Sequence, residues 1–269
     1  MTAISNAFLK LHIKGQPLVM PNPWDLGSTR ILEQMGFRAL ATTSAGFAFT
    51  LGRRDAEGGI TRDEAIAHAR QIAEATDLPV NGDTENGFGP TPDDCAETAR
   101  QSVAAGLAGF SIEDATGDHS DPIFEFDLSV ERVRAAVEAG RDAGGIVMTA
   151  RAENFLYGKR DLDDTIRRLN AFADAGADVL YAPGLRDIET VRTVIRSVDR
   201  PVNILASPGL TAPELADAGA ARISLGSAFA INAWRGLVNA AEEVLDQGSF
   251  GFAAGKPGFM DINKMMKGR

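Results

Sequence analysis

The sequence predicts an α/β protein folded as a single (β/α)8 barrel over residues 1–269. Eight short β-rich runs alternate with Ala-, Glu- and Arg-rich stretches of helical period, an alternation typical of parallel βαβ units. The competing fold, an open doubly wound sheet, usually has a glycine-rich phosphate loop after its first strand, but neither GxGxxG nor GxxxxGKS/T occurs in the chain. Since crossovers between parallel strands are right-handed, eight such units close most economically into a barrel.

The eight predicted strands follow one another at the spacing that βα units require. Each run ends in small or polar residues, where the chain would leave the strand for a loop. In chain order the runs span residues 17–22, 39–45, 79–85, 109–115, 145–153, 178–184, 201–207 and 221–227.

The stretches between the strands carry helix start and stop signals. Residues 91–106 begin with a Thr or Asp cap, place acids in the first turn and end at Gly106. Residues 161–178 repeat this order, and their helix should end at Gly176. The motifs "AGLAGF", "AGADVL" and "AGAARI" then recur as joints between a helix and the next strand.

Composition and charge narrow the classes of ligand. The formal net charge is -10, so nucleic acids and anionic membranes are poor partners and a small metabolite is expected. The single cysteine, Cys95, excludes an intramolecular disulfide and a thiolate zinc site, and we expect it to be a small buried core residue. With no run of about 18 apolar residues and no signal-peptide pattern, we expect a cytoplasmic protein.

Acidic side chains gather at the ends of predicted strands that should be neighbours in the barrel. Asp83 and Glu85 end the third strand, Glu113 and Asp114 lie near the end of the fourth, and Arg151 lies on the fifth. Because all strands of a barrel open on one mouth, these carboxylates would repel each other unless a cation lay among them, and hard oxygen ligands suit Mg²⁺ or Mn²⁺. The alternative, that an acid caps a helix or is solvated, applies to any one of them but does not explain their clustering.

At these residues the chain resembles the isocitrate lyase and phosphoenolpyruvate mutase superfamily. The similar segments run in order over most of the chain: "NPWDLGSTRILEQMGFRALATTSAGFAFTLGRRD", "PVNGDTENGFG", "FSIEDA", "TARAENF" and "ISLGSAFA". The resemblance implies a (β/α)8 barrel whose last helix is swapped between neighbouring subunits, and hence a homodimer or homotetramer. The C-terminal helical segment and tail, from about residue 230 to 269, would make this subunit contact.

The resemblance also implies roles for single residues. The segment "TTSAG" resembles a loop that binds the carboxylate and carbonyl of a 2-oxo acid, and Arg151 matches an arginine that clamps the substrate. The alternative is that Arg151 only neutralises Glu153 and Asp114. Asp83 and Glu113 match carboxylates that hold Mg²⁺ largely through water, and Glu85 belongs to a slightly longer loop beside them. The predicted catalytic residues are Arg151, Asp55, Glu113 and His119, the predicted metal ligands are Asp83, Glu85 and Glu113, and the predicted substrate contacts are Trp24, Thr43, Ser44, Ala45, Gly46, Arg151 and Asn203.

Departures from the family pattern bear on the reaction. After the fourth strand the chain reads "ATGDHSDPIFEFD" in place of the lyase motif Lys-Lys-Cys-Gly-His, and Pro183 stands where mutases have a histidine. Asn81 replaces an aspartate, which removes one negative charge from the metal shell. His119 could act as a general acid or base in the loop after the fourth strand, or it could be a solvated surface residue.

These departures favour a Mg²⁺-dependent lyase or hydrolase acting on a small 2-oxo or 2-hydroxy carboxylic acid. The reaction would cleave or decarboxylate a C–C bond through an enolate, whose oxygen a metal ion and aimed N–H donors stabilise. Two alternatives stay open: a C–P bond enzyme of the phosphonopyruvate hydrolase or mutase type, and a barrel that binds 2-oxo acids without turnover.

Overall fold

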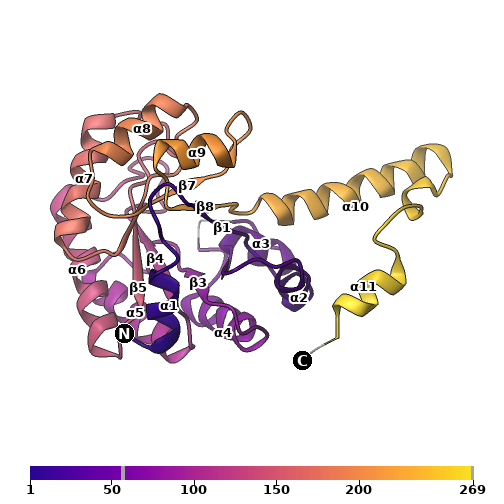
Figure 1. Ribbon diagram of the computed structural model, residues 1–269, viewed down its shortest axis with the longest axis horizontal. Coiled ribbons are helices and arrows are strands. Elements are labelled where there is room, and N and C mark those ends of the chain that lie inside the picture. Colours follow the sequence, from indigo (N-terminus) through magenta and orange to yellow (C-terminus); the bar gives the residue numbers. More distant parts are fainter. Residues whose placement is uncertain (56–57, 268–269) are drawn as a thin grey trace.

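The computed structural model describes every residue except 56–57 and 268–269, and it confirms the (β/α)8 barrel (Figure 1). Eight parallel strands form one sheet in the order β1-β8-β7-β6-β5-β4-β3-β2. The two ends of this order meet where Ala41 N donates to Pro21 O at 3.0 Å, so the barrel is nearly closed. Each predicted run contains one strand: β1 Leu18–Met20, β2 Leu40–Ala41, β3 Val80–Asp83, β4 Gly109–Glu113, β5 Val147–Arg151, β6 Val179–Tyr181, β7 Val202–Leu205 and β8 Arg222–Ser224.

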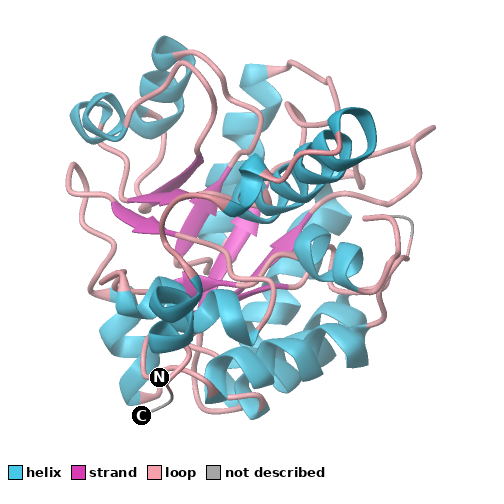
Figure 2. Ribbon diagram, turned by 90° about the vertical axis from the view of Figure 1, so that its right-hand side faces the viewer, coloured by secondary structure: helices cyan, strands magenta, loops and turns pink. Residues whose placement is uncertain are grey.

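Helices surround the strands and connect them (Figures 1 and 2). Among the described helices, none combines the length and the apolar run that a membrane crossing needs. Their bounds are α1 Ala3–Leu9, α2 Leu26–Gln34, α3 Ser44–Thr50, α4 Arg62–Glu74, α5 Pro92–Ala104, α6 Phe126–Asp142, α7 Leu162–Asp174, α8 Ile188–Arg196, α9 Ala212–Ala218, α10 Ala228–Gln247, the short 3₁₀ helix η1 Gly251–Ala253, and α11 Phe259–Met265.

The helix boundaries follow local sequence signals. Thr91 caps α5 in a capping box, and Asp161 caps α7 by accepting the backbone N–H three residues on. Gly106 and Gly176 follow these helices with φ of 79° and 105°, a backbone conformation that glycine adopts without strain. The predicted starts and stops of both helices are therefore confirmed. Cys95 on α5 is fully buried, as expected, and burial raises the pKa of its thiol to about 11.

α1 lies at the N-terminal end of the barrel and fills it. Phe8 is fully buried and belongs to an apolar cluster with Leu18, Val147 and Val179, which begin β1, β5 and β6. Because apolar side chains occupy this end, polar chemistry is confined to the opposite end, where the carboxyl ends of the strands open.

The C-terminal segment leaves the barrel as an arm (Figure 1). Along α10, Ala230 is the one buried residue, whereas Leu237 and Leu245 are 59% and 84% exposed. The arm then turns back, and Arg30 on α2 donates to Met266 O at 2.7 Å, just beyond α11. The exchange of this arm between subunits stays a prediction.

Candidate active site

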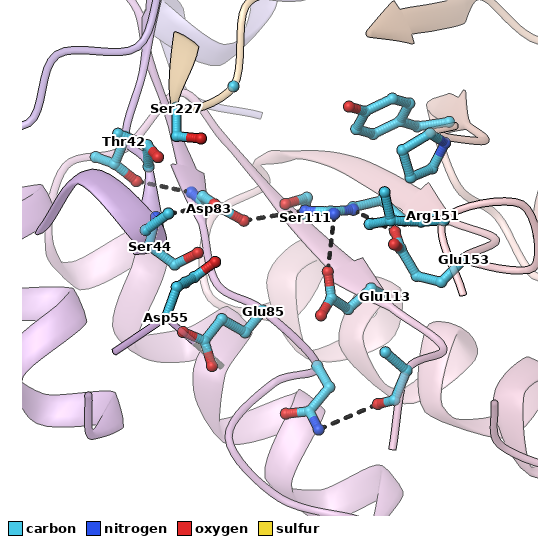
Figure 3. A pocket seen from close by; sticks show the side chains of 18 of the residues that line it. Thr42, Ser44, Asp55, Asp83, Glu85, Ser111, Glu113, Arg151, Glu153 and Ser227 are labelled. Carbon is cyan, nitrogen blue, oxygen red and sulfur yellow. Dashed lines mark hydrogen bonds and ion pairs between the residues drawn. The ribbon is translucent and has the colours of Figure 1, made fainter. Parts of the chain in front are cut away.

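The carboxyl ends of the strands enclose a cavity of about 1220 Å³ (Figure 3). Since the strands of a parallel barrel all point the same way, each contributes its last inward-facing side chain to this one space. On β3, β4 and β5 these side chains are Asp83, Glu113 and Arg151, and the loops that follow add Glu85 and Glu153. The acids that the sequence places at separate strand ends therefore share one cavity.

Arg151 lies at the centre of the charged cluster (Figure 3). Its Nη1 is 3.1 Å from Asp83 Oδ1, its Nη2 is 3.0 Å from Glu113 Oε2, and its Nε donates to Glu153 Oε1 at 2.7 Å. The guanidinium also lies 5.2 Å from the ring centroid of Tyr181. Burial alone would lower the pKa of Arg151, but the neighbouring carboxylates outweigh burial and raise that pKa. Arg151 therefore stays charged and fixes three carboxylates around it.

Glu153 is fixed a second time through its backbone. Its N–H donates to Asp114 Oδ1 at 2.8 Å, and Asp114 Oδ2 accepts from Arg168 Nη1 on α7 at 3.2 Å. Arg151 thus neutralises Glu153, as one interpretation of the sequence held, but Asp114 is paired with Arg168. Burial raises the pKa of Glu153 and of Glu113, while Arg151 opposes that rise. The second oxygen of Glu153, Oε2, has no hydrogen-bond partner among the described residues.

Asp83 is tied to the loop after β2. Ser44 N donates to Asp83 Oδ2 at 3.0 Å, and Asp83 N donates to Thr42 Oγ1 at 2.8 Å (Figure 3). Thr43 caps α3, since its Oγ1 accepts from Gly46 N at 3.2 Å. The predicted loop for the 2-oxo acid therefore lies directly beside a predicted metal carboxylate.

The loop after β3 has an uncommon backbone conformation. Glu85 and Phe88 have φ of 46° and 59°, values that side-chain-bearing residues rarely adopt. Arg62 and Arg132 hold the loop by donating to backbone carbonyls within residues 86–89. Strained residues of this kind persist where the surroundings fix them and are frequent at functional sites.

Negative charge exceeds positive charge around Glu85. Burial first, and then the charges of Asp83 and Asp55, raise the pKa of the Glu85 carboxyl to about 8. A divalent cation would relieve this repulsion, and the all-oxygen set of Asp83, Glu85 and Glu113 suits Mg²⁺. Among the described residues, no three acidic, histidine or cysteine side chains form a ready-made metal cage. A Mg²⁺ ion bound by these carboxylates would keep several waters, as Mg²⁺ usually does.

A second polar group forms the floor of the cavity. Arg222 on β8 is 2% exposed and donates to Thr149 Oγ1 at 3.1 Å and to His12 Nε2 at 3.3 Å. Burial, followed by the charge of Arg222, lowers the pKa of His12 to about 3, so the ring is neutral. Its Nδ1 can then donate to Phe8 O of α1 at 3.0 Å while its Nε2 accepts from Arg222. Asn203 donates to Ser224 Oγ at 3.0 Å in the same layer. Asn203 therefore lines the floor of the cavity instead of its mouth.

The predicted site residues divide into two groups. The first group lines the cavity and consists of Thr43, Ser44, Ala45, Asp55, Asp83, Glu85, Glu113, Arg151 and Asn203. Trp24, Gly46 and His119 are not among the described residues that line it.

Packing and hydrogen bonding explain the positions of Gly46 and Trp24. A Cβ on Gly46 would lie 2.6 Å from Thr43 Cγ2 and 2.9 Å from Trp24 Cβ, so glycine lets α3 pack on the segment after β1. The carbonyl of Trp24 is hydrogen-bonded to His68 Nε2 at 3.0 Å. His119 lies exposed on its loop, and its catalytic role stays a prediction.

Ser111 and Tyr157 are among the residues that line the cavity and that the sequence analysis missed. Ser111 lies two residues before Glu113 on the same face of β4, so the two-residue period of a strand could have identified it. Tyr157 comes from the irregular loop after β5, where no periodicity signals a site. Burial, followed by the charges of Glu113 and Glu153, raises the pKa of Tyr157 to about 12, so its hydroxyl stays protonated.

Comparison with known proteins finds matches over most of the chain. Residues 8–245 match the family model described as phosphoenolpyruvate phosphomutase. The chain is 28% identical over 250 residues to 2-methylisocitrate lyase from Escherichia coli strain K12, covering 88% of this chain and 82% of the relative.

Two solved structures are similar over nearly the whole chain. One is a putative lyase/mutase from Burkholderia cenocepacia J2315, with a TM-score of 0.93, 46% identity, and coverage of 97% of this chain and 94% of the other. The other is a 2,3-dimethylmalate lyase, with a TM-score of 0.86, 27% identity, and coverage of 98% and 95%. The chain therefore belongs to the phosphoenolpyruvate phosphomutase family, and it is a member of the superfamily of isocitrate lyases and phosphoenolpyruvate mutases.

Proposed function

We propose that the chain is a Mg²⁺-dependent carbon–carbon lyase that cleaves a small 2-oxo or 2-hydroxy carboxylic acid through an enolate. The observation that carries this proposal is Arg151, held by three carboxylates at the mouth of the barrel beside the start of α3. A fixed guanidinium suits the carboxylate of a substrate and the negative charge that develops on oxygen when a bond next to a carbonyl breaks. The relatives named as lyases support the same class of reaction.

The residues of the cavity would divide the work. Arg151 and the loop of residues 43–46 would bind the carboxylate and orient the oxygen at C2. Asp83, Glu85 and Glu113 would hold Mg²⁺, which when bound supplies Lewis-acid stabilisation of charge on oxygen. Tyr157 keeps its proton on Oη and is the candidate group for protonating the enolate carbon.

Decarboxylation and hydrolytic cleavage develop the same enolate charge, so the same residues would serve those reactions. A C–P bond reaction is less well supported. Pro183 lines the cavity at the end of β6, where it offers no side-chain donor to a phosphoryl group.

We also propose that the protein is a homodimer or homotetramer whose C-terminal arms are exchanged. The support is the apolar surface on α10, including a groove between α3 and α10 lined by Phe49, Ile231 and Trp234. Burying such surface in a second subunit stabilises an assembly. Analytical ultracentrifugation should therefore give a dimer or tetramer, and a monomer at micromolar concentration would contradict this proposal.

The experiment for the reaction is a panel of 2-oxo and 2-hydroxy acids, with Mg²⁺ and then with chelator. Products are read out as pyruvate, glyoxylate, oxalate and carbon dioxide. Turnover should require Mg²⁺ and should fall by orders of magnitude in Arg151→Met and Asp83→Asn. Arg100→Met is the matched control, because the Arg100 side chain is 57% exposed and pairs with the surface residue Glu97. Equal turnover in Arg151→Met and Arg100→Met would refute the site.

A further inference from the structure

We propose that Tyr181 is a catalytic residue whose hydroxyl donates a hydrogen bond, from the floor of the cavity, to the substrate oxygen that becomes negatively charged in the enolate. The proposal rests on the lyase function above and adds a donor on β6, outside the charged cluster of β3, β4 and β5. Asn203 and Ser224 are positioning residues in this proposal, because they fix the direction in which the Tyr181 hydroxyl donates.

Tyr181 lies beside the arginine that is proposed to bind the substrate. It is the last residue of β6 and pairs in register with Arg151 of β5. The Arg151 guanidinium lies 5.2 Å from the centroid of the Tyr181 ring. Tyr181 lines the cavity although it is only 7% exposed. A small acid bound by Arg151 would therefore lie next to this tyrosine.

Two hydrogen bonds in series fix the Tyr181 hydroxyl. Asn203 Nδ2 donates to Ser224 Oγ at 3.0 Å, and Ser224 Oγ donates to Tyr181 Oη at 3.3 Å. Because a hydroxyl has one hydrogen and an amide nitrogen only donates, Ser224 uses its hydrogen on Tyr181, whose oxygen accepts it. The hydrogen of the Tyr181 hydroxyl then meets no acceptor among the described residues. Buried phenols usually have a partner, so this donor is available to a bound ligand.

A positive charge without an acidic partner lies near this hydroxyl. Arg222 precedes Ser224 by two residues on the same face of β8. Within the described chain its partners are the neutral groups Thr149 Oγ1 at 3.1 Å and His12 Nε2 at 3.3 Å, and its Nε has none. Burial lowers the pKa of Arg222 to about 10, so the guanidinium is still charged near neutral pH. Its charge favours an anion beside Tyr181.

The acids of the cavity lie on its other side. Every described acid that lines the cavity comes from β3, β4 or the connections after β2, β3 and β5. The described polar side chains that line the β6–β8 side are Tyr181, Asn203, Arg222, Ser224 and Ser227. Negative charge that develops on this side is therefore met by donors and by a cation instead of by carboxylates.

A donor in this place would act mainly on the enolate. When a bond next to a carbonyl breaks, negative charge develops on the oxygen at C2, and a hydrogen bond to that oxygen strengthens as the charge grows. Burial raises the pKa of Tyr181 to about 12, so the proton stays on Oη and is shared without being transferred. Tyr181 should therefore stabilise the enolate more than the 2-oxo acid from which it forms.

The test is isothermal titration of the whole protein, in Mg²⁺, with pyruvate and with oxalate. Oxalate is a planar dianion that resembles the enolate of pyruvate. Tyr181→Phe keeps the ring beside Arg151 and removes only the hydroxyl. It should weaken oxalate binding at least about tenfold, as the loss of a hydrogen bond to a charged group does, and pyruvate binding less than about threefold. Exchange of the pyruvate methyl protons in deuterium oxide should slow about a hundredfold in the same variant.

A second variant tests the direction of the hydrogen bonds. Ser224→Ala should weaken oxalate binding a few-fold in the wild-type background and should have no effect in Tyr181→Phe, because Ser224 acts through the hydroxyl. Ser224→Ala keeps the tyrosine, so it tests the same hydroxyl even if Tyr181→Phe does not fold. Ser197→Ala, at an exposed position at the end of α8, is the matched control and should change neither affinity.

The outcomes separate this proposal from the lyase function. Equal oxalate affinity in wild type and Tyr181→Phe, or tighter oxalate binding in Ser224→Ala, would overturn the role of Tyr181 and leave the lyase function standing. Failure of both acids to bind the wild-type protein in Mg²⁺ would overturn both.

Discussion

Replacing Glu85 by glutamine should stabilise the protein at high pH. Folding raises the pKa of Glu85 from its ordinary value of 4.5 to about 8, through burial and the charges of Asp83 and Asp55. A carboxyl whose pKa is raised on folding binds its proton more tightly in the native state, so it lowers stability as the pH rises from about 4.5 to about 8. At about 1.4 kcal/mol per pH unit, the loss above pH 8 is at most about 5 kcal/mol. Glu85→Gln has no such charge and should escape this loss.

Urea unfolding at about pH 5, 7 and 9 measures the effect, at one protein concentration and without Mg²⁺. The variant should be more stable than the parent by a few kcal/mol at about pH 9, and the difference should vanish toward about pH 5. Glu242→Gln, at an exposed position on α10, is the matched control and should follow the parent. Adding Mg²⁺ should shrink the gap, because a bound cation favours the ionised Glu85. A parallel pH dependence for Glu85→Gln and the parent would refute the reasoning about excess negative charge.

Three further substitutions test other parts of the site. Arg151→Met leaves Glu153 and Glu113 buried without their cation, so the free energy of unfolding in urea should fall by about 3–5 kcal/mol near neutral pH. The same substitution should lower kcat/KM at least about a thousandfold. Wild-type stability would contradict this prediction. Arg168→Met removes the partner of Asp114, and steady-state kinetics should show kcat lowered about tenfold to a hundredfold. Arg168→Lys should recover part of this loss. An unchanged kcat would show that Arg168 does not position the site. Tyr157→Phe should lower kcat by about 10²–10⁴ with little change in KM or in melting temperature, and full activity would exclude Tyr157 as the proton donor.

The strands were predictable from sequence because each is short, rich in β-branched or small residues, and followed by polar residues at the mouth of the barrel. All eight runs contain a strand. The helix limits at Thr91, Gly106, Asp161 and Gly176 were predictable for a local reason, since caps and left-handed glycines act within one turn. The near closure between β1 and β2 was inferred only from topology, because it depends on contacts between residues far apart in the chain.

The charged site was predictable in part. Asp83, Glu113 and Arg151 converge because parallel strands open on one mouth, which is a property of the topology. How deep a residue lies along its strand was not predictable. Asn203, predicted as a substrate contact, does line the cavity, but it lies in the floor layer with Arg222. The place of Tyr157 was not predictable either, because an irregular loop has no period to indicate which side chains turn inward.

The central claim is that this cavity stabilises the enolate of a 2-oxo acid, and proton NMR of pyruvate in deuterium oxide measures it directly. Enolate formation exchanges the methyl protons with solvent deuterium, so the methyl signal should disappear much faster with enzyme and Mg²⁺ than with Mg²⁺ alone. The exchange should return to the background rate with chelator and in Arg151→Met, and should continue in Arg100→Met. A methyl signal that decays at the background rate with the wild-type protein and Mg²⁺ would contradict the account.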